Sequence, residues 1–412
     1  MKQYFNKKNI YNPLLALLLS MGFLISCNKD VQQMGDIQQP VRSGETLDQL
    51  LRNNPDDSLY YRLMIKGGQV AMISDSNKSF TMFVPGNDAM KKFITAISGG
   101  VVVPILPNAV FSQFITNFIT TEQAAALVQY NTMPQAITTS SIPATFPNFF
   151  YPSTFNPAPS ISSLFRMDVY PSTRNGAWLN NLPLTNVNTT AYNGVIHHCA
   201  GLAVPPQRYL WDRINTDTSL AYLKAAINRA DSGSAAPGFL QGVLNNIGAN
   251  LTVFAPTNDA FQITLKGLIA QTLISQGVPQ QIALAQATAL SSTPDVFNNS
   301  LLYSVLTAEK VKGLLVYHIL GSRAFTNNFP RNPTPQPTLL QVPGMTNALP
   351  VFLNCKFGMP FVDSATVKGL GNPAPVNIII NSTPLTADPD GTSDQLYLNG
   401  ILHKIDGILM PQ

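Results

Sequence analysis

The side chains of this chain that could do chemistry are few. It has 21 acidic residues, three cysteines and four histidines, which are His197, His198, His318 and His403. His197 and Cys199 lie two positions apart, so on a strand both would share one face and could bind zinc. A zinc ion in a protein takes four ligands, and this pair has no recognisable partners. We therefore expect no metal site and no cofactor.

An acidic segment near the C-terminus offers a second kind of metal site. Asp388, Asp390 and Asp394 supply oxygen donors at short spacing, as calcium loops do. The order of an EF-hand is absent, because Gly391 stands at the fourth position counted from Asp388. Asp-Pro-Asp-Gly at 388–391 also forms a good turn without an ion. We predict a turn, with a calcium loop as the alternative.

The motifs of common enzymes are absent from the sequence. It contains no G-x-S-x-G segment, no H-E-x-x-H segment, no Walker A loop and no Rossmann glycine fingerprint. These motifs position the nucleophiles, metals and phosphates of hydrolases and nucleotide-dependent enzymes. We therefore expect a protein that is not an enzyme and has no catalytic residue.

The first 27 residues have the layout of an exported lipoprotein. Three lysines and no acid come before an apolar run from Leu14 to Ile25, which is shorter than the roughly 20 residues that span a bilayer. The run ends in Leu-Ile-Ser-Cys, which resembles the bacterial lipobox, whose cysteine is diacylated and becomes the new N-terminus. This predicts a signal peptide over 1–26, a lipid on Cys27 and a flexible tether over 27–42. The alternative is an ordinary signal peptide with an incidental cysteine.

The charge of the mature chain argues against nucleic acid as a partner. Removal of residues 1–26 takes three of the 25 basic residues and none of the 21 acidic ones, which leaves 22 and 21 and a net charge of +1. No cluster of Lys and Arg remains that could neutralise phosphates. Two acyl chains give stable anchoring to a membrane. We expect a lipid-anchored protein of the outer membrane or cell surface.

Three landmarks occur twice in the chain, in the same order. The two copies of each landmark align without gaps, which indicates an internal repeat. The pairs are Thr81–Met90 with Thr252–Phe261, Thr120–Asn131 with Thr307–His318, and Asn193–His197 with Asn399–His403.

These landmarks resemble the fasciclin (FAS1) family. The first is similar to its TVFAPTNDAF motif, the second to its Tyr-His motif and the third to its NGVIHVID motif. The first copy departs at Asn131, where the family has histidine, and at Gly86, where it has threonine. The resemblance implies two tandem fasciclin-like domains, over 43–207 and 208–412. Each is expected to be α+β, a largely antiparallel β wedge packed with α-helices.

The residues of the first landmark predict a strand followed by a helix. Thr252 to Ala255 is apolar and partly β-branched, and Pro256 ends the strand. Thr257 or Asn258 can then accept a backbone N–H as the N-cap of the helix. In the first copy Gly86 has no side chain for this purpose, so we expect Asn87 to be the N-cap.

The other two landmarks place the histidines on a helix and a strand. Helical spacing puts His318 on the buried face of a helix, where we expect it to be hydrogen-bonded and where Asn131 can replace it. Alternation along the last strand puts Ile401, His403 and Ile405 on the core face and Leu402, Lys404 and Asp406 on the other. We therefore interpret His197 and His403 as structural. His198, which aligns with Lys404, is expected to be solvated. In the second copy Ile405 stands at the position of Cys199, which weakens the interpretation of His197 and Cys199 as zinc ligands.

Cys199 and Cys355 lie in different halves of the chain. A disulfide needs Cα atoms within about 7 Å, which this separation does not favour. We expect each cysteine to be a small buried hydrophobic residue.

Two long segments have no counterpart in the family motifs. Residues 99–119 are apolar and aromatic, and residues 262–306 are rich in Leu, Ile, Gln and Ala. They either form an exposed interface or fold down and enlarge the core. We expect binding specificity in these inserts, and a deletion of most of 265–300 to leave the second copy folded.

The resemblance implies adhesion or binding as the function. Expected partners are a surface or matrix protein or an extracellular polysaccharide, and the binding residues are unknown. The alternative is an accessory lipoprotein of an outer-membrane glycan-uptake complex. A third hypothesis, an enzyme of unrecognised type, would need a pocket that gathers several carboxylates.

Overall fold

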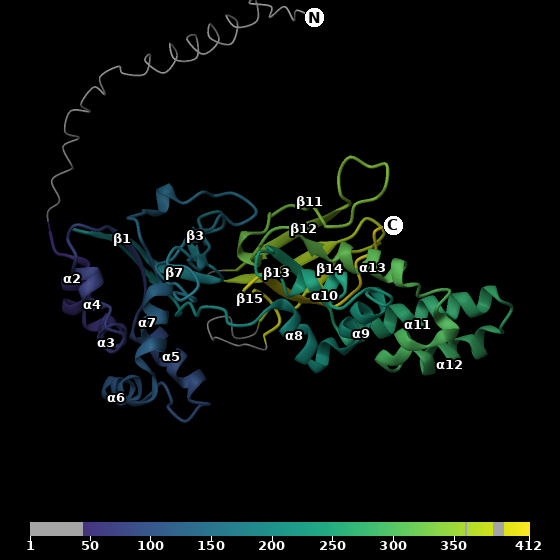
Figure 1. Ribbon diagram of the computed structural model, residues 1–412, viewed down its shortest axis with the longest axis horizontal. Helices are drawn as coiled ribbons and strands as arrows, with labels where there is room; N and C mark the ends of the chain where they lie inside the picture. The colour runs from purple at the N-terminus through teal and green to yellow at the C-terminus, as the bar shows by residue number, and fades with distance from the viewer. Residues whose placement is uncertain (1–43, 359–360, 382–390) are drawn as a thin grey trace, which may run out of the picture. The chain divides into compact units, whose positions relative to one another are not determined.

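The computed structural model describes residues 44–358, 361–381 and 391–412. Within them the same order of elements occurs twice, over residues 45–205 (the first repeat) and 208–412 (the second repeat), as Figure 1 shows. Both repeats belong to one compact unit, Glu45–Gln412. Cys27, the predicted signal peptide and the tether up to residue 42 lie outside the described residues, as do Asp388 and Asp390.

The first repeat begins with helices that form one side of its core. Leu63, Phe111 and Val128 from three of these helices are fully buried together in a cluster that also covers one face of the sheet. The helices are α2 (Leu47–Asn53), α3 (Ser58–Lys66), α4 (Val70–Ser74), α5 (Asn87–Ile97), α6 (Asn108–Phe118) and α7 (Thr121–Tyr130).

The sheet of the first repeat has the strand order β2-β1-β8-β7-β6-β5. The central pair β1 and β8 is parallel, and the other pairs are antiparallel. Its strands are β1 (Phe80–Pro85), β2 (Thr132–Met133), β5 (Pro171–Ser172), β6 (Trp178–Leu179), β7 (Leu182–Ala191) and β8 (Gly194–Cys199), while β3 (Tyr151–Pro152) and β4 (Asp168–Val169) pair separately.

The second repeat follows the same plan with longer strands and one longer helix. Its sheet order is β10-β9-β16-β14-β13-β12-β11, with β15 paired to β16, and only β9 and β16 are parallel. The helices are α8 (Leu210–Thr216), α9 (Ala221–Ala230), α10 (Phe239–Leu244), α11 (Asn258–Ser275), α12 (Gln280–Leu290) and α13 (Ala308–Tyr317). The strands are β9 (Leu251–Pro256), β10 (Ile319–Leu320), β11 (Thr334–Pro337), β12 (Pro350–Phe357), β13 (Val362–Lys368), β14 (Val376–Ile378), β15 (Gln395–Tyr397) and β16 (Gly400–Ile405).

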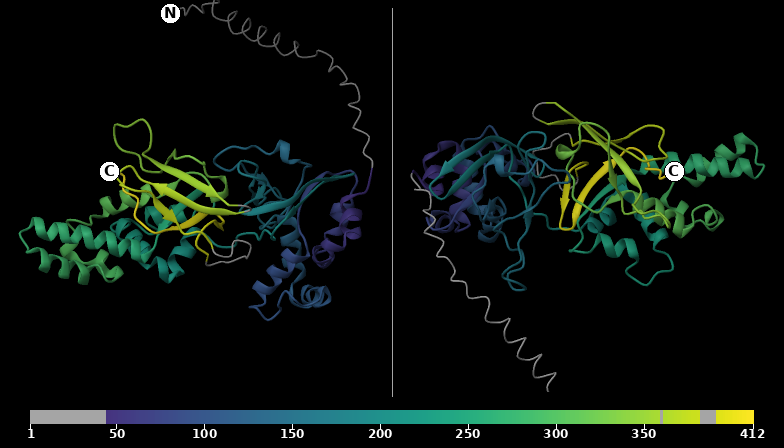
Figure 2. Two further views of the ribbon diagram at one scale, coloured as in Figure 1. Left: turned by 180° about the vertical axis from the view of Figure 1, so that it is seen from behind. Right: turned by 90° about the horizontal axis from the view of Figure 1, so that it is seen from above.

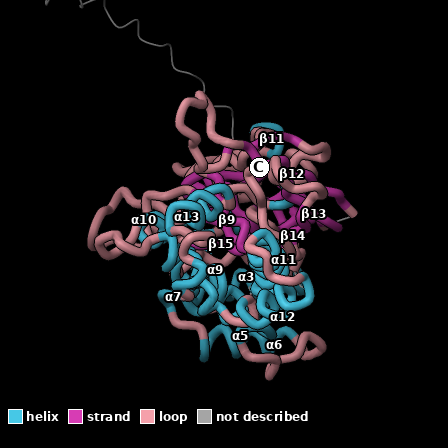
Figure 3. Tube along the Cα trace, turned by 90° about the vertical axis from the view of Figure 1, so that its right-hand side faces the viewer, coloured by secondary structure: helices cyan, strands magenta, loops and turns pink. Residues whose placement is uncertain are grey.

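Each repeat is therefore α+β, with mostly antiparallel strands, as predicted. Figure 3 shows most of the helices gathered on one side of the strands. Among the described residues no helix is both long enough and apolar enough to cross a membrane.

The last strand, β16, is buried on both faces, which corrects the prediction of a single core face. Leu402 packs into the cluster on the helical side, and Ile405 packs into a second cluster on the opposite side. All six residues of β16 are buried. Alternation identified the two faces correctly but could not show that each is covered by a different layer.

The prediction that His198 is solvated is also wrong. Its Nε2 lies 3.1 Å from an Asp57 carboxylate oxygen, and its side chain is 18% exposed. The aligned Lys404 is 7% exposed and places Nζ 2.8 Å from the Asp217 carboxylate. In both repeats the side chain at this position is thus paired with an aspartate that follows the first helix, Asp57 after α2 and Asp217 after α8.

The first landmark forms a strand and a helix, but its asparagine does not cap the helix. Thr257, one of the two N-cap residues predicted for the second copy, accepts the Ala260 N–H at 3.3 Å. In the first copy Gly86 is the N-cap residue and makes no side-chain bond. Asn87 instead accepts the Leu59 N–H at 3.0 Å, so the prediction that Asn87 caps the helix is wrong. Asn87 thereby links the start of α5 to the first turn of α3.

Both inserts contribute to the cores. Phe111 and Ile115 of α6 are buried in the first repeat, and Ile269 of α11 is buried in the second. Outward-facing apolar side chains remain, such as Ile105, Phe118, Ile263 and Leu301. Helices α11 and α12 project together from the rest of the second repeat (Figures 1 and 2).

Candidate binding site at the junction of the repeats

His403 is fixed by hydrogen bonds on both ring nitrogens. Its Nε2 donates to the Ala324 carbonyl at 2.9 Å, and its Nδ1 accepts the Asp394 N–H at 3.1 Å. The ring stacks on Phe254 with centroids 5.9 Å apart. Burial lowers the pKa of His403, so the ring is neutral at pH 7. No nitrogen is left for a substrate or a metal.

His197 makes the same bonds in the first repeat. Nε2 donates to the Ile137 carbonyl at 2.9 Å, and Nδ1 accepts the Asn188 N–H at 3.1 Å. Burial also lowers the pKa of His197. Asn188 and Asp394 both adopt the left-handed conformation, with φ of 63° and 55°, which asparagine and aspartate tolerate better than most residues. The structural interpretation of both histidines is confirmed.

Asn131 and His318 also have matching roles. His318 Nδ1 donates to the Leu314 carbonyl at 2.8 Å, and Nε2 accepts the Leu409 N–H at 2.9 Å. Asn131 is fully buried, and its Nδ2 donates to the Leu127 carbonyl at 2.8 Å. Its Oδ1 accepts the Ala203 N–H at 3.3 Å.

The cysteines are free and buried, as expected. Burial raises the pKa of the Cys199 thiol, and it raises the pKa of the Cys355 thiol to about 12. In the part of the chain that the structure describes, no group of three or more His, Cys, Asp or Glu side chains is placed to hold a metal ion.

A segment of the second repeat, residues 323–331, is held by the first repeat. It contains the 3-10 turn η7 (Thr326–Asn328). Amide side chains make most of the contacts across this junction. The hydrogen bonds, each given from donor to acceptor, are Asn327 Nδ2 to the Asn180 carbonyl (2.7 Å), Asn328 Nδ2 to the Thr145 carbonyl (2.9 Å), Ser172 Oγ to Asn328 Oδ1 (2.9 Å), Asn175 Nδ2 to the Asn327 and Phe329 carbonyls (both 2.9 Å), and the Phe325 N–H to Asn148 Oδ1 (3.1 Å).

Aromatic side chains pack beside these amides. Tyr170 lies 5.8 Å from Phe325 between ring centroids, and Ile401 shares their buried cluster. Phe146 meets Phe329 edge to face at 6.0 Å. The junction therefore combines apolar burial with paired amides, which is the composition of a stable interface core.

The first repeat has an equivalent turn with different chemistry. The turn η3 (Thr139–Ser141) aligns with η7, and Asn188 binds Thr139 as Asp394 binds Thr326. Ser140 and Ser141, which align with Asn327 and Asn328, are exposed. The turn of the second repeat therefore carries buried asparagines where the turn of the first repeat carries exposed serines.

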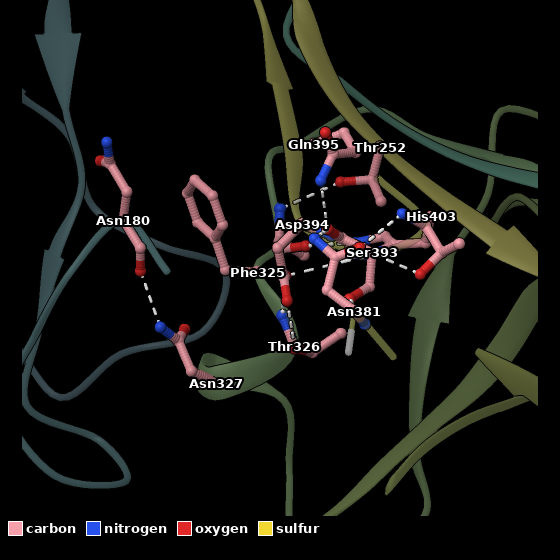
Figure 4. Close-up of polar contacts among 12 residues, drawn as sticks. Asn180, Thr252, Phe325, Thr326, Asn327, Asn381, Ser393, Asp394, Gln395 and His403 are labelled. Carbon is pink, nitrogen blue, oxygen red and sulfur yellow. Dashed lines mark hydrogen bonds and ion pairs between the residues drawn. The ribbon is translucent and has the colours of Figure 1, made fainter. Parts of the chain in front are cut away.

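A cavity of about 230 Å³ lies at the junction. Two of its lining residues, Trp178 and Asn181, come from the β6–β7 hairpin of the first repeat. The others come from the second repeat, and they are Thr326, Asn327, Phe361, Val362, Ile380, Asn381, Ser393 and Asp394. Figure 4 shows the polar contacts of several of these side chains.

Some polar groups of this cavity are already paired, and others are not. The Asp394 carboxylate accepts the N–H and the hydroxyl of Thr326, at 2.7 and 2.6 Å. Asn327 Nδ2 donates a hydrogen bond to the Asn180 carbonyl, but the buried Asn327 Oδ1 has no partner among the described residues. Within the same part of the chain, the Asn181 side chain also has no partner. Because Asn327 Oδ1 is covered from solvent, the unpaired group that the cavity offers to a ligand is the half-buried Asn181 amide.

The Fasciclin domain family model matches the chain twice, over residues 56–205 and 235–411. The chain belongs to the fasciclin domain family. A solved FAS1 domain pair from the insect cell adhesion molecule fasciclin I is 14% identical to it, with a TM-score of 0.32, and the match covers 86% of this chain and 96% of that one. No curated protein matches the chain.

The fasciclin motifs identify the scaffold rather than the binding site. Their histidines and asparagines are hydrogen-bonded to the backbone of their own domain. Of the residues singled out in the sequence, only Asp394 lines the cavity, and its expected partners Asp388 and Asp390 lie outside the described residues. The other lining residues were missed. One available signal was the Asn327-Asn328 pair, where the first fasciclin domain has two serines.

Proposed function

We propose that this chain is a lipid-anchored surface protein whose two fasciclin domains bind a protein or glycan partner. The observation that supports binding is the junction cavity, whose lining includes the unpaired Asn181 amide. The motif histidines, in contrast, already form hydrogen bonds through both ring nitrogens. A ligand in the cavity can bond the Asn181 amide and pack against the apolar walls beside it. Among its described lining residues the cavity has one carboxylate, fewer than the several that the hypothesis of an unrecognised enzyme requires.

The proposed anchor is a lipid on Cys27, at the outer membrane or cell surface. Its support is the order of lysines, apolar run, small residue and cysteine in the sequence. In cells that express the full chain, the Cys27→Ala variant should move from the membrane fraction to the soluble fraction. The matched control is Cys355→Ala, which removes a buried cysteine elsewhere and should remain in the membrane fraction. Membrane retention of Cys27→Ala would contradict the anchor.

The binding role can be tested with the mature chain without its lipid. Immobilised residues 28–412 are incubated with surface-labelled cell extract and, separately, with extracellular polysaccharide. We expect specific retention of at least one component. A Val362→Trp variant, which fills the junction cavity, should retain less. If the wild-type and filled proteins retain the same material, the binding site lies elsewhere.

The alternative function is an accessory role in an outer-membrane glycan-uptake complex. The amide groups and apolar walls of the cavity suit a glycan, which agrees with this alternative. Co-purification from membranes under mild detergent distinguishes the two proposals. A transporter recovered with the chain would support the uptake complex, whereas a matrix component or another surface protein would support adhesion.

A further inference from the structure

We propose that the junction cavity binds one uncharged sugar ring, held between the two fasciclin domains. This inference rests on the proposed binding function and names the chemical class of the ligand. It follows from the size, hydrogen-bonding groups, apolar walls and charge of the cavity.

The size of the cavity suits a small ring. Its volume is about 230 Å³. Sites for drug-sized ligands are larger, at about 300–1,000 Å³. The cavity is therefore of a size that suits one small ring, such as a single sugar residue.

The unpaired groups require a ligand that both donates and accepts hydrogen bonds. The Asn181 amide, which has no partner among the described residues, can both donate and accept. Ser393 Oγ accepts the Asn381 N–H at 3.0 Å, so its own hydrogen remains to be donated. Hydroxyl groups combine donor and acceptor in one atom, and a sugar carries several around one ring.

The remaining walls of the cavity are apolar. Trp178 donates its indole N–H to the Asn175 carbonyl at 2.9 Å, so it offers a ligand only its ring carbons. Phe361, Val362 and Ile380 complete the apolar lining. A sugar ring has C–H groups between its hydroxyls, and these match walls of this kind. A ligand with polar groups alone would leave these side chains without a complementary surface.

The charge of the cavity excludes ionic ligands. No Lys or Arg is among the lining residues in the described part of the chain, so phosphate, sulfate and carboxylate groups find no counter-charge there. Asp394 is the single carboxylate among the described lining residues, and both of its oxygens accept hydrogen bonds from Thr326. A calcium ion takes six to eight oxygen ligands, which one engaged carboxylate does not supply.

The ligand would touch both domains at once. Trp178 and Asn181 lie on one domain, and Val362 and Ser393 lie on the other. A ligand that binds only when the domains are docked stabilises the docked arrangement by mass action. Sugar binding should therefore be lost when the junction is disrupted, even if each domain remains folded.

Trp178 provides a direct readout. The chain has two tryptophans, Trp178 and Trp211. In a Trp211→Phe background, the fluorescence of the mature chain reports on the cavity. The probes are D-glucose, D-galactose, D-mannose, N-acetyl-D-glucosamine, and D-glucuronate as a charged counterpart of glucose. At least one neutral sugar should change the fluorescence saturably, and glucuronate should bind more weakly than glucose.

Three variants in the same background test the location. Asn181→Ala should weaken binding about tenfold, as expected for the loss of one well-placed hydrogen bond. Val362→Trp should abolish binding, measured by calorimetry because it adds a tryptophan. Asn186→Ala is the matched control, since Asn186 is an exposed asparagine of β7 that does not line the cavity. It should bind as the parent does.

The proposal is overturned by any of three results. They are the absence of saturable binding by all neutral sugars, unchanged binding by Val362→Trp with native circular dichroism, and equal affinity for glucose and glucuronate. If sugar binding fails while the mature chain still retains a surface protein from cell extract, the binding function stands and only the ligand class is wrong. If neither is observed, the proposed function fails as well.

Discussion

Asn131 and His318 occupy equivalent positions in the two fasciclin domains and make the same pair of hydrogen bonds. Each donates to the carbonyl four residues earlier and accepts a backbone N–H after the last strand, from Ala203 or Leu409. Asn131 Nδ2 also donates to the Ala203 carbonyl at 2.7 Å. The two side chains differ in titration as well, because histidine titrates near neutral pH and asparagine does not. This difference gives a test with a built-in control.

Loss of the His318 side chain should destabilise the second domain. His318→Ala leaves the Leu409 N–H and the Leu314 carbonyl without their partner in a buried site. The expected cost is roughly 1–3 kcal/mol of unfolding free energy, measured by urea denaturation at pH 7.5. His198→Ala is a comparison at a histidine outside this motif. If His318→Ala abolished ligand binding with an unchanged melting temperature, the structural interpretation would be wrong.

The stability contributed by His318 should depend on pH. Burial lowers its pKa in the folded state to about 4, against about 6.5 in the unfolded chain. As the pH falls below about 6.5, the unfolded state takes up a proton that the folded state does not. Stability is therefore fully present above about pH 6.5 and falls by up to roughly 3 kcal/mol towards pH 4.

His318→Asn isolates this effect. The variant copies the arrangement of the first domain and should lose less stability than wild type between pH 7 and pH 4. His197 and His403 titrate in both proteins, so their contributions cancel in the comparison. Equal pH profiles for wild type and His318→Asn would show that His318 does not titrate as described.

The junction should depend on Asn328. This residue is fully buried and bonds both Ser172 and the Thr145 carbonyl across the junction. Asn328→Ala should lower stability by roughly 1–3 kcal/mol and separate the unfolding of the two domains into two calorimetric transitions. The aligned residue Ser141 is exposed, so Ser141→Ala should change stability by less than about 0.5 kcal/mol. A single unchanged transition in Asn328→Ala would place the coupling elsewhere.

Deletion of residues 265–300 should unfold the second domain, contrary to the sequence prediction. The segment supplies Ile269, Val296 and Phe297 to the core. Removing several buried apolar side chains costs about 2–5 kcal/mol for each large one, which exceeds the stability of most domains. Far-ultraviolet circular dichroism and melting curves measure the result.

Substitution of the exposed surface is the control for that deletion. Ile263 is 72% exposed and Leu301 is 81% exposed. Changing both to serine should leave the fold and melting temperature nearly unchanged, because little apolar area is removed from the core. If this variant folds but captures less partner, the outer surface of the insert contributes to binding. If the deletion variant were to remain folded, the core assignment would be wrong.

The sequence by itself determined the domain repeat and the roles of the motif histidines. These features depend on local information: the aligned landmarks, the helical spacing before His318 and the alternation around His403. The sequence also showed that Asn131 has the donor and acceptor needed to replace histidine. It did not show that β16 is covered on both faces, because alternation separates two faces without stating what packs on each.

Only the tertiary structure decided the junction and its cavity. Asn175 and Asn327 are 152 positions apart, and Trp178 reaches the cavity because the β6–β7 hairpin meets a turn of the other domain. Asparagine is a common loop residue, so its presence in two loops predicts no contact between them. The binding chemistry arises where two chain segments of unremarkable composition are brought together, and that placement depends on the packing of both domains.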